Sequence, residues 1–472
     1  NFIVMGWVIN AMASVVSVML NMDKWTAVWL CVIIALVYAI LSGFWGVVIT
    51  DLVQFVIAMF GSITLAIIAL NYVGGMESLL GKLSEYVGTD VVNKNTLKFI
   101  PPVPEAGVTT STFWESPFSK FLIYISVMWW SHHGTDGGGY IIQRMSSAKN
   151  ERHALLATLW YNLAHYALRV WPWIIVAVVS IVMFPIIPES YTQLGTKAGY
   201  PLVMNTLLGP GLKGILIVSF LAAFMSTIDT HLNWGVSYLI NDIYKRFYKP
   251  NESETHYVFI GKILTVILMV LAAFTALKMQ SISKAWEFIF AMGAGIGLVL
   301  ILRWFWWRVN AWSEITALAT SIFITITLEI IAYSQAISNQ ETYTLFGSAP
   351  VLFGITLQVH HKLMIIVPMA IITWIIVTFN TKPEPIEKLK EFYARVQPGG
   401  WWGPINHDFD HTMQPVTKGI FVLWLAGILM IYGFTFGIGN LIFQNYASSV
   451  LLFGCAFTGT YLVWNRNLSK LN

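Results

Sequence analysis

Long apolar runs separated by short polar segments are the main pattern along this chain. A helix needs about 20 mostly apolar residues to cross the roughly 30 Å hydrocarbon layer of a bilayer. Runs of that length predict helices, because membrane β-strands would be about ten residues long with alternating polarity. About twelve such runs occur, at 1–20, 25–43, 51–73, 119–143, 154–184, 203–245, 257–278, 284–305, 313–335, 363–379, 417–437 and 441–464. The pattern therefore predicts an all-α polytopic membrane protein.

The composition excludes most other classes of protein. Only 11% of the residues are charged, against about 25% in an average soluble domain. The net charge of +4 is spread over many loops without a dense basic stripe, so nucleic acid is not an expected partner. Two cysteines, Cys31 and Cys455, both inside apolar runs, exclude a disulfide scaffold. The expected surroundings are a lipid bilayer.

Basic residues are concentrated in alternate loops, at 144–152, 245–249, 303–308 and 382–395. Cytoplasmic loops carry an excess of Lys and Arg, so these loops are expected in the cytoplasm of a bacterial inner-membrane protein. The last of them belongs to a longer loop at about 380–416. Within it, the charge pattern predicts a short amphipathic helix that is simply solvated.

The sixth run carries three hydroxyl residues on one helical face. Ala223, Ser226, Thr227 and Thr230 follow the spacing i, i+3, i+4 and i+7. Hydroxyl and carbonyl oxygens suit a hard cation such as Na⁺. The alternative is tight helix packing, with the hydroxyls bonded back to carbonyls of the same helix. Asp229 sits beside this face, and a carboxylate is difficult to explain by packing.

A second carboxylate, Asp51, opens the third run. An acidic residue at the N-terminus of a helix offsets the helix dipole. Asp51 therefore has two open interpretations: an interfacial helix start or part of a functional site.

The fourth run is interrupted by glycines at 137–139, next to Asp136. Three glycines should break a helix, and broken helices within a membrane are tolerated only where protein or a water-filled cavity satisfies the freed backbone groups. Such breaks mark binding sites in transporters. A simple kink or an early helix end is the alternative. His132 and His133 are not expected to share a metal, because adjacent helical residues point about 100° apart.

The fifth run has a polar stripe, and the eighth has three glycines. Thr158, Asn162, His165 and Arg169 are spaced at i, i+4, i+7 and i+11, which favours a helix that faces the bundle interior or a cavity. Glycines at 293, 295 and 297 permit bending or close approach of helices. The basic and aromatic cluster at 303–308 is interpreted as an interfacial anchor without a ligand.

Three motifs together resemble the sodium:solute symporter family, which includes sodium-coupled sugar, proline and sialic-acid transporters. They occur in the family's order and at compatible spacing, over roughly residues 1–335. The motifs are Ile49-Thr50-Asp51-Leu52-Val53-Gln54, Tyr140-Ile141-Ile142-Gln143-Arg144 and Ala222-Ala223-Phe224-Met225-Ser226-Thr227.

The resemblance implies two five-helix inverted repeats with extra helices outside them. Asp51 would open core helix five, which makes the run at 1–20 core helix three. The first core helices would then be missing, and the initial Asn1 also favours a sequence begun part-way through a larger protein. We expect a transporter core over 1–309 and peripheral transmembrane helices over 310–472.

The resemblance also implies sodium ligands. The Ala223 carbonyl and the Ser226 and Thr227 hydroxyls would belong to the main sodium site. Some members have a second site, which here would combine Asp51 with Thr227 and Thr230, while Asp229 replaces a hydroxyl of that site. The number of sodium ions, or the use of a proton at Asp229, stays open. Na⁺ is expected as coupling ion, with no other cofactor.

The solute is less well defined. Ser131, Gly134 and His165 stand where sugar-transporting relatives carry a sugar-contacting asparagine, an aromatic gate and a sugar-contacting lysine. A polar lining rich in His and Trp suits a sugar, or a sugar-like or carboxylated compound. The other candidates for the solute site are His132, Thr135, Asp136 and Asn162. The function implied is sodium-coupled symport of a small polar solute by alternating access.

A multi-pass membrane enzyme is the alternative from another class. It would use Asp136 with His132 or His133 as acid and base. The two long loops, at 74–118 and 380–416, offer only His407, Asp408, Asp410 and His411 as a cluster, whose spacing could hold a metal but favours a solvated loop. The chain is therefore not expected to be an enzyme.

Overall fold

The structure is a computed structural model that describes residues 1–41, 44–85, 97–104, 107, 110–279, 281–346, 348–406 and 417–466. It describes only the backbone at 40–41, 44–52, 110–112, 140, 143–144, 406, 417–418, 420 and 466. Within the described residues, nine helices are long and apolar enough to cross a membrane, and a bent pair of helices adds a tenth span. The all-α membrane fold expected from the apolar runs is confirmed.

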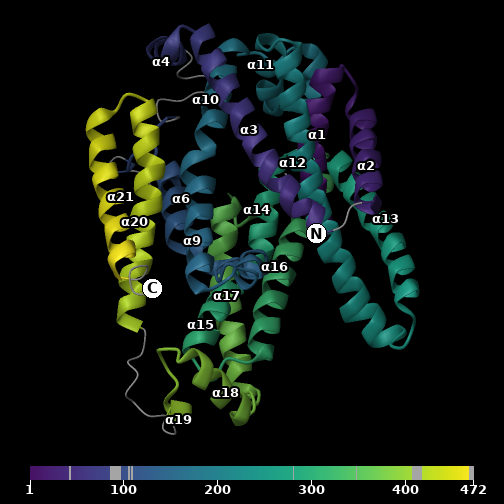
Figure 1. Ribbon diagram of the computed structural model, residues 1–472, viewed down its shortest axis with the longest axis vertical. Coiled ribbons are helices and arrows are strands. Elements are labelled where there is room, and N and C mark those ends of the chain that lie inside the picture. The colour runs from purple at the N-terminus through teal and green to yellow at the C-terminus, as the bar shows by residue number, and fades with distance from the viewer. Residues whose placement is uncertain are drawn as a thin grey trace. The chain divides into compact units, whose positions relative to one another are not determined.

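The chain packs into two compact units. Unit 1 comprises Asn1–Lys94, Arg169–Ala285 and Thr344–Gly347. In it, α1 packs against α2, α12 and α13, and α12 also packs along α3. Its elements are α1 (Phe2–Leu20), α2 (Lys24–Leu41), α3 (Phe44–Tyr72), α4 (Gly75–Glu85), α10 (Val170–Met183), the 3₁₀-helix η3 (Glu189–Ala198), α11 (Gly199–Leu207), α12 (Pro210–Ser237), the π-helix η4 (Tyr238–Tyr248) and α13 (Glu254–Lys278) (Figure 1).

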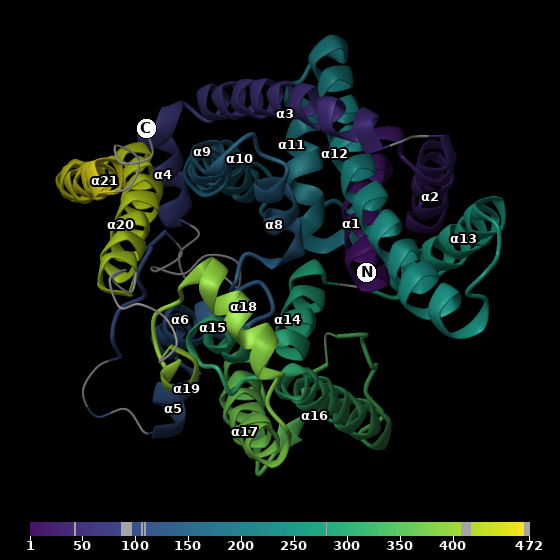
Figure 2. The same cartoon turned by 60° about the horizontal axis from the view of Figure 1, so that its bottom comes forward.

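Unit 2 comprises Asn95–Leu168, Trp286–Tyr343 and Ser348–Asn472. Two helix pairs in it, α16 with α17 and α20 with α21, lie side by side (Figure 2). Helix α14 (Ile282–Gly293) begins in unit 1 and continues into unit 2. The other elements are α5 (Thr110–Glu115), α6 (Pro117–Ile123), the π-helix η1 (Tyr124–Met128), α7 (Trp129–Ser131), α8 (Gly138–Ser146), α9 (Glu151–Asn162), the π-helix η2 (Leu163–Leu168), α15 (Gly297–Phe305), α16 (Ala311–Ser338), β1 (Val351–Leu352), β2 (Ile355–Thr356), α17 (Val359–Asn380), α18 (Ile386–Val396), α19 (Gly403–Asn406), α20 (Thr417–Ile442) and α21 (Tyr446–Arg466).

The two strands of unit 2 form a short antiparallel pair in which Val351 faces Thr356 and Leu352 faces Ile355. Packing divides the chain differently from the expected division by role into 1–309 and 310–472. The division by role stays a prediction, because both units contain residues from the expected transporter core.

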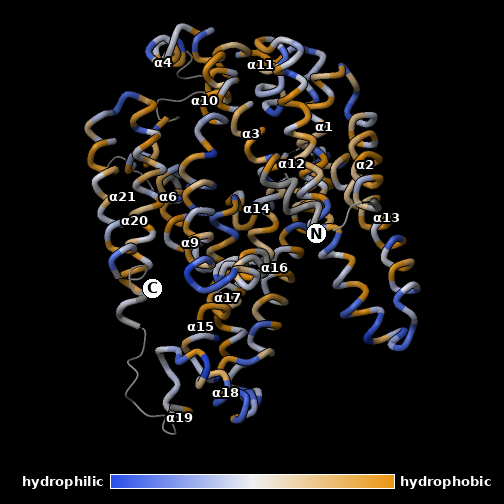
Figure 3. Tube along the Cα trace, in the orientation of Figure 1, coloured by the Kyte–Doolittle hydropathy of each residue, from blue (hydrophilic) through white to orange (hydrophobic). Residues whose placement is uncertain are grey.

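Two of the apolar runs form shorter elements than a full span. The run at 25–43 gives α2, which has 18 residues. The run at 119–143 is divided among α6, η1, α7 and α8, because its polar and glycine-rich centre interrupts the helix. The run at 284–305 forms the bent pair α14 and α15, and the remaining runs form long helices made mostly of hydrophobic residues (Figure 3). The amphipathic helix expected near 383–396 is α18, which is largely hydrophilic.

Side-chain caps set the first turns of several helices. Ser116 accepts a hydrogen bond from the Ser119 amide at the start of α6, where Pro117 occupies the first position. Asn150 accepts one from the His153 amide at the start of α9. Such caps satisfy amides that have no partner within the helix. They determine where the elements around the interrupted run begin.

Candidate functional site

The hydroxyl face of α12 lies in unit 1. The Thr227 hydroxyl donates to the Ala223 carbonyl at 3.0 Å, and the Thr230 hydroxyl donates to the Ser226 carbonyl at 3.0 Å. Ala223 is exposed within the described residues, and Ser226 and Thr227 are half-buried. The bonds to carbonyls one turn earlier are those expected from packing. They also hold the Thr227 hydroxyl and the Ala223 carbonyl close enough together to contact one cation.

Asp229 of α12 lies beside the hydroxyl face, about 60° around the helix from Ser226. Asp229 is 3% exposed, and one of its carboxylate oxygens accepts a hydrogen bond from the side-chain amide of Asn233 at 3.2 Å. This carboxylate therefore lies next to the face that carries Ala223 and Thr227, not within it.

Asp51 belongs to α3, which packs along α12. Its side chain lies outside the described residues, as do the side chains of Tyr140, Gln143 and Arg144 in the second family motif. The place of Asp51 in a sodium site stays a prediction.

The interrupted run in unit 2 has a true break at 132–137. Gly137 and Gly138 have φ angles of 90° and 61°, a left-handed backbone that side chains with a Cβ seldom adopt. The Asp136 carboxylate accepts a hydrogen bond from the Gly138 amide at 3.0 Å, at the first turn of α8. The break predicted from the glycines is thus confirmed, and two of the glycines are needed for its geometry.

A second break lies against the first. Helices α14 and α15 are bent by 41° about residues 294–296. A Cβ placed on Gly297 would come within 2.3 Å of the Trp130 carbonyl oxygen, and one on Gly293 would come within 2.6 Å of the His133 ring. The glycines of the eighth run therefore allow the two broken helices to pack backbone against backbone.

Most polar groups of the first break hold the break itself. His132 Nδ1 accepts from the Gly134 amide at 2.9 Å, and the Thr135 hydroxyl donates to the His132 carbonyl at 2.5 Å. The His132 ring packs edge to face on Phe290, with ring centres 5.4 Å apart. These contacts give the loop a defined shape.

Ser131 differs from its neighbours. Its side chain is 1% exposed, and its hydroxyl has no hydrogen-bond partner among the described residues. A buried hydroxyl without a partner carries a free-energy cost. Among the buried side chains at the break, Ser131 therefore carries a hydroxyl that a ligand could pair.

Arg303 forms an ion pair with Asp136 that the sequence interpretation missed. Its guanidinium donates to the Asp136 carboxylate at 2.6 Å and lies 3.4 Å from the Glu314 carboxylate. The interpretation of the cluster at 303–308 as an interfacial anchor did not include this pairing. Arg303 ties the C-terminus of α15 to the loop of the first break. The sequence did contain one signal for this pairing. Asp136 is a carboxylate inside an apolar run, and such a carboxylate needs a positively charged partner nearby.

The polar stripe of the fifth run is only partly regular. Thr158 and Asn162 bond to carbonyls four residues earlier within α9. His165 lies in the π-helix η2 and stacks on Tyr161, with ring centres 5.1 Å apart. A π-helix has more residues per turn than an α-helix, so the spacing that aligned His165 and Arg169 with Asn162 does not continue through it.

No group of three His, Cys, Asp or Glu side chains that could hold a metal ion occurs in the described part of the chain. His407, Asp408, Asp410 and His411 lie outside that part. Asp136, the proposed acid or base of a membrane enzyme, is already paired with Arg303.

Comparison with known families decides the identity of the chain. The model of the sodium:solute symporter family matches residues 2–323, which is more than half of the sequence. The chain belongs to the sodium:solute symporter family. This confirms the resemblance seen in the three motifs.

Several curated proteins are similar to this symporter-family chain. It is 22% identical over 334 residues to a sodium/glucose cotransporter of Vibrio parahaemolyticus, covering 66% of the chain and 58% of the relative. It is 26% identical over 395 residues to sodium/glucose cotransporter 1 of Mus musculus, covering 78% and 58%. It is 24% identical over 320 residues to the osmoregulated proline transporter OpuE of Bacillus subtilis, covering 65% and 58%. The chain thus matches somewhat more than half the length of these relatives.

A solved structure supports the same fold. The substrate-bound outward-open state of a Na⁺-coupled sialic acid symporter aligns with a TM-score of 0.52 at 16% identity, over 81% of this chain and 73% of that one. At this identity the likeness concerns the fold alone. The inverted-repeat symporter architecture implied by the family motifs is consistent with it.

Proposed function

We propose that this chain carries the core of a sodium-coupled symporter, which moves a small polar solute across a bacterial inner membrane by alternating access. The observation that carries the proposal is the hydroxyl and carbonyl face of α12 in a member of the sodium:solute symporter family. Na⁺ is a hard cation, and the oxygens of Ala223, Ser226 and Thr227 are hard ligands. Asp51, Asp229 and Thr230 are the proposed groups of a second cation or proton site.

The proposed solute is a sugar, or a sugar-like or carboxylated compound. Relatives named for glucose, proline and sialic acid transport support a small polar solute without choosing among these classes. Ser131, Asn162 and His165 are the proposed solute contacts. The remaining candidates for the solute site contribute by fixing the shape of the break: His132, Gly134, Thr135 and Asp136.

Sodium binding tests the α12 proposal directly. Purified protein in nanodiscs is titrated with NaCl at constant ionic strength, with choline as the replacement, and the apparent melting temperature is followed. A ligand that binds only the folded state stabilises it by RT ln(1 + L/Kd), where L is the free ligand concentration. The dependence on Na⁺ concentration therefore gives the apparent Kd, which we call the Na⁺ midpoint. Thr227→Ala should raise this midpoint about tenfold, since it removes a hydroxyl from a charged ligand set.

Thr265→Ala is the matched control. Thr265 on α13 makes the same bond, from its hydroxyl to the Gly261 carbonyl at 2.9 Å, and is also half-buried. It should leave the Na⁺ midpoint unchanged. Equal midpoints for Thr227→Ala and the wild-type protein would show that the hydroxyl face serves packing alone.

A further inference from the structure

A cavity of about 330 Å³ lies wholly within unit 1, and none of its lining residues is a solute candidate. Its lining comes from α1, α10, α11, α12, the end of η3 and the start of α14. The volume is at the lower end of the range for small-molecule sites, which is about 300–1,000 Å³. The cavity can therefore hold a compact organic molecule.

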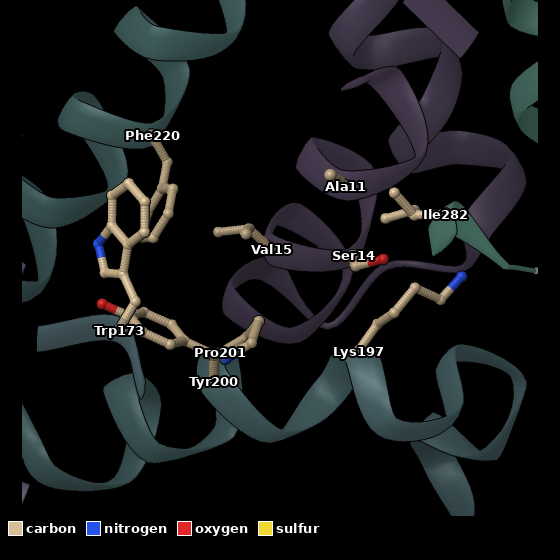
Figure 4. A pocket seen from close by; sticks show the side chains of 9 residues that line it. All are labelled: Ala11, Ser14, Val15, Trp173, Lys197, Tyr200, Pro201, Phe220 and Ile282. Atoms are coloured by element: carbon tan, nitrogen blue, oxygen red, sulfur yellow. The ribbon is translucent and has the colours of Figure 1, made fainter. Parts of the chain in front are cut away.

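One end of the cavity is aromatic. Trp173, Tyr200 and Phe220 gather there, as Figure 4 shows. The Trp173 indole donates to the Ser62 hydroxyl at 2.9 Å, and Tyr200 packs edge to face on Phe220 with ring centres 5.7 Å apart. These contacts fix the rings before any ligand arrives, which reduces the entropy lost on binding.

The other end carries a positive charge. Lys197 and Ser14 lie there, across the cavity from the rings (Figure 4). The Lys197 ammonium donates to the Asn10 side-chain carbonyl at 3.1 Å, and Asn10 is 1% exposed. The Ser14 hydroxyl donates to the Asn10 backbone carbonyl at 2.9 Å.

A second lysine strengthens this positive end. Lys24 of α2 donates to the Leu277 and Met279 carbonyls at the C-terminus of α13, and the Asn10 amide donates to the Met279 carbonyl as well. Asn10 thus links Lys197 to the helix end that Lys24 caps. The negative end of the α13 dipole offsets part of the charge of the two ammonium groups.

We propose that this cavity binds a small organic carboxylate with a compact aromatic or aliphatic body. The carboxylate pairs with the Lys197 ammonium, and the body packs on Trp173, Tyr200 and Phe220. A charge-assisted hydrogen bond in an apolar enclosure is strong, and the rings bury the apolar part. None of the residues that line this cavity is a proposed solute contact.

The protonation of Lys197 gives the site a pH dependence. Burial, and then repulsion from Lys24, lower the pKa of Lys197 to about 8. Lys24 is the charged group that acts on it, and the Asn10 amide oxygen is its hydrogen-bond acceptor. Above pH 8 the amine becomes neutral and loses its attraction for an anion. A bound carboxylate opposes that loss, because it stabilises the charged form.

The test uses 4-(trifluoromethyl)phenylacetate as probe, with binding followed by ¹⁹F NMR on the protein in nanodiscs and with empty nanodiscs as baseline. Lys197→Met should weaken binding at pH 7 at least about tenfold, since it removes a charged hydrogen bond. Lys197→Arg should bind the probe as the wild-type protein does. The neutral probe 2-(4-(trifluoromethyl)phenyl)ethanol should bind about tenfold more weakly than the carboxylate.

Lys213→Met is the matched control. Lys213 also belongs to unit 1 and also donates to an asparagine side-chain carbonyl, that of Asn205 at 2.7 Å, but it does not line the cavity. Probe binding should be unchanged in this variant. Equal binding by Lys197→Met and the wild-type protein, or by the alcohol and the carboxylate, would overturn the proposal.

Two further measurements keep the proposal testable if Lys197→Met does not fold. Raising the pH from 7 to 9.5 should release the probe from the wild-type protein and not from Lys197→Arg, whose side chain stays charged. Unlabelled phenylacetate should displace the probe. Displacement by palmitate alone would identify a lipid site and overturn the proposal of a compact carboxylate.

Discussion

At the residue scale, the ion pair between Asp136 and Arg303 shows that a polar residue in a membrane span can stabilise the fold as well as bind a ligand. The carboxylate of Asp136, 9% exposed, is held by Arg303 and by the Gly138 amide. The residue therefore stabilises the break between α7 and α8, and through it the position of Ser131. The role of Asp136 as a solute contact stays a prediction.

Asp136→Asn should reduce stability by about 1–2 kcal/mol, because Arg303 would lose a charged partner in a mostly buried place. Thermal unfolding in nanodiscs measures the effect. Glu391→Gln is the control: it removes an exposed pair with Arg395, at 2.7 Å, and should change stability by less than about 0.5 kcal/mol. An unchanged melting temperature for Asp136→Asn, together with an altered KM for transport, would instead make Asp136 a solute contact.

The sequence predicted which residue types matter, but not which of them contact one another. The spacing of Ala223, Ser226, Thr227 and Thr230 was enough to place them on one face, because helical periodicity is a local property. Arg303 could not be paired with Asp136, since 167 positions separate them and the pairing depends on how α15 packs. The role of Asp229, which follows Ser226 by three positions and so lies beside the hydroxyl face, stays a prediction.

At the element scale, broken helices are the feature that the sequence predicted best. Glycines at 137–139 predicted the first break, because left-handed backbone at Gly137 and Gly138 is available to glycine at little cost. The π-helix η2 was not predicted, since π-helices have no strong local sequence signal. Because η2 is a π-helix, the α-helical spacing that places Asn162 and His165 on one polar face does not hold through it.

Gly297→Ala should destabilise the protein by about 1–3 kcal/mol, because its Cβ would meet backbone atoms of Trp130, Ser131 and His132, which cannot move aside as a flexible side chain can. Thermal unfolding in nanodiscs again provides the measurement. Gly454→Ala on α21 is the control, since its Cβ would meet open space and alanine favours a helix. A neutral Gly297→Ala would mean that the two breaks are not tightly packed.

At the scale of the whole molecule, composition and run length were sufficient for the membrane class, and the family motifs were sufficient for the fold. Neither could give the division into two units, because each unit is assembled from segments far apart in the sequence. The cavity beside Lys197 was also beyond prediction. Its lining combines residues from six elements that are spread widely along the sequence.

The central claim is that Na⁺ drives solute accumulation. The most direct measurement is uptake into proteoliposomes under an inward Na⁺ gradient, with choline as the control, for a panel of radiolabelled monosaccharides, sialic acids, amino acids and nucleosides. One Na⁺ moving through 100 mV contributes about 2.3 kcal/mol, which supports roughly 50-fold accumulation. We expect Na⁺-dependent accumulation of one solute class by the wild-type protein. This accumulation should be lower in Thr227→Ala and unchanged in Thr265→Ala. Accumulation that proceeds equally well in choline would contradict the claim.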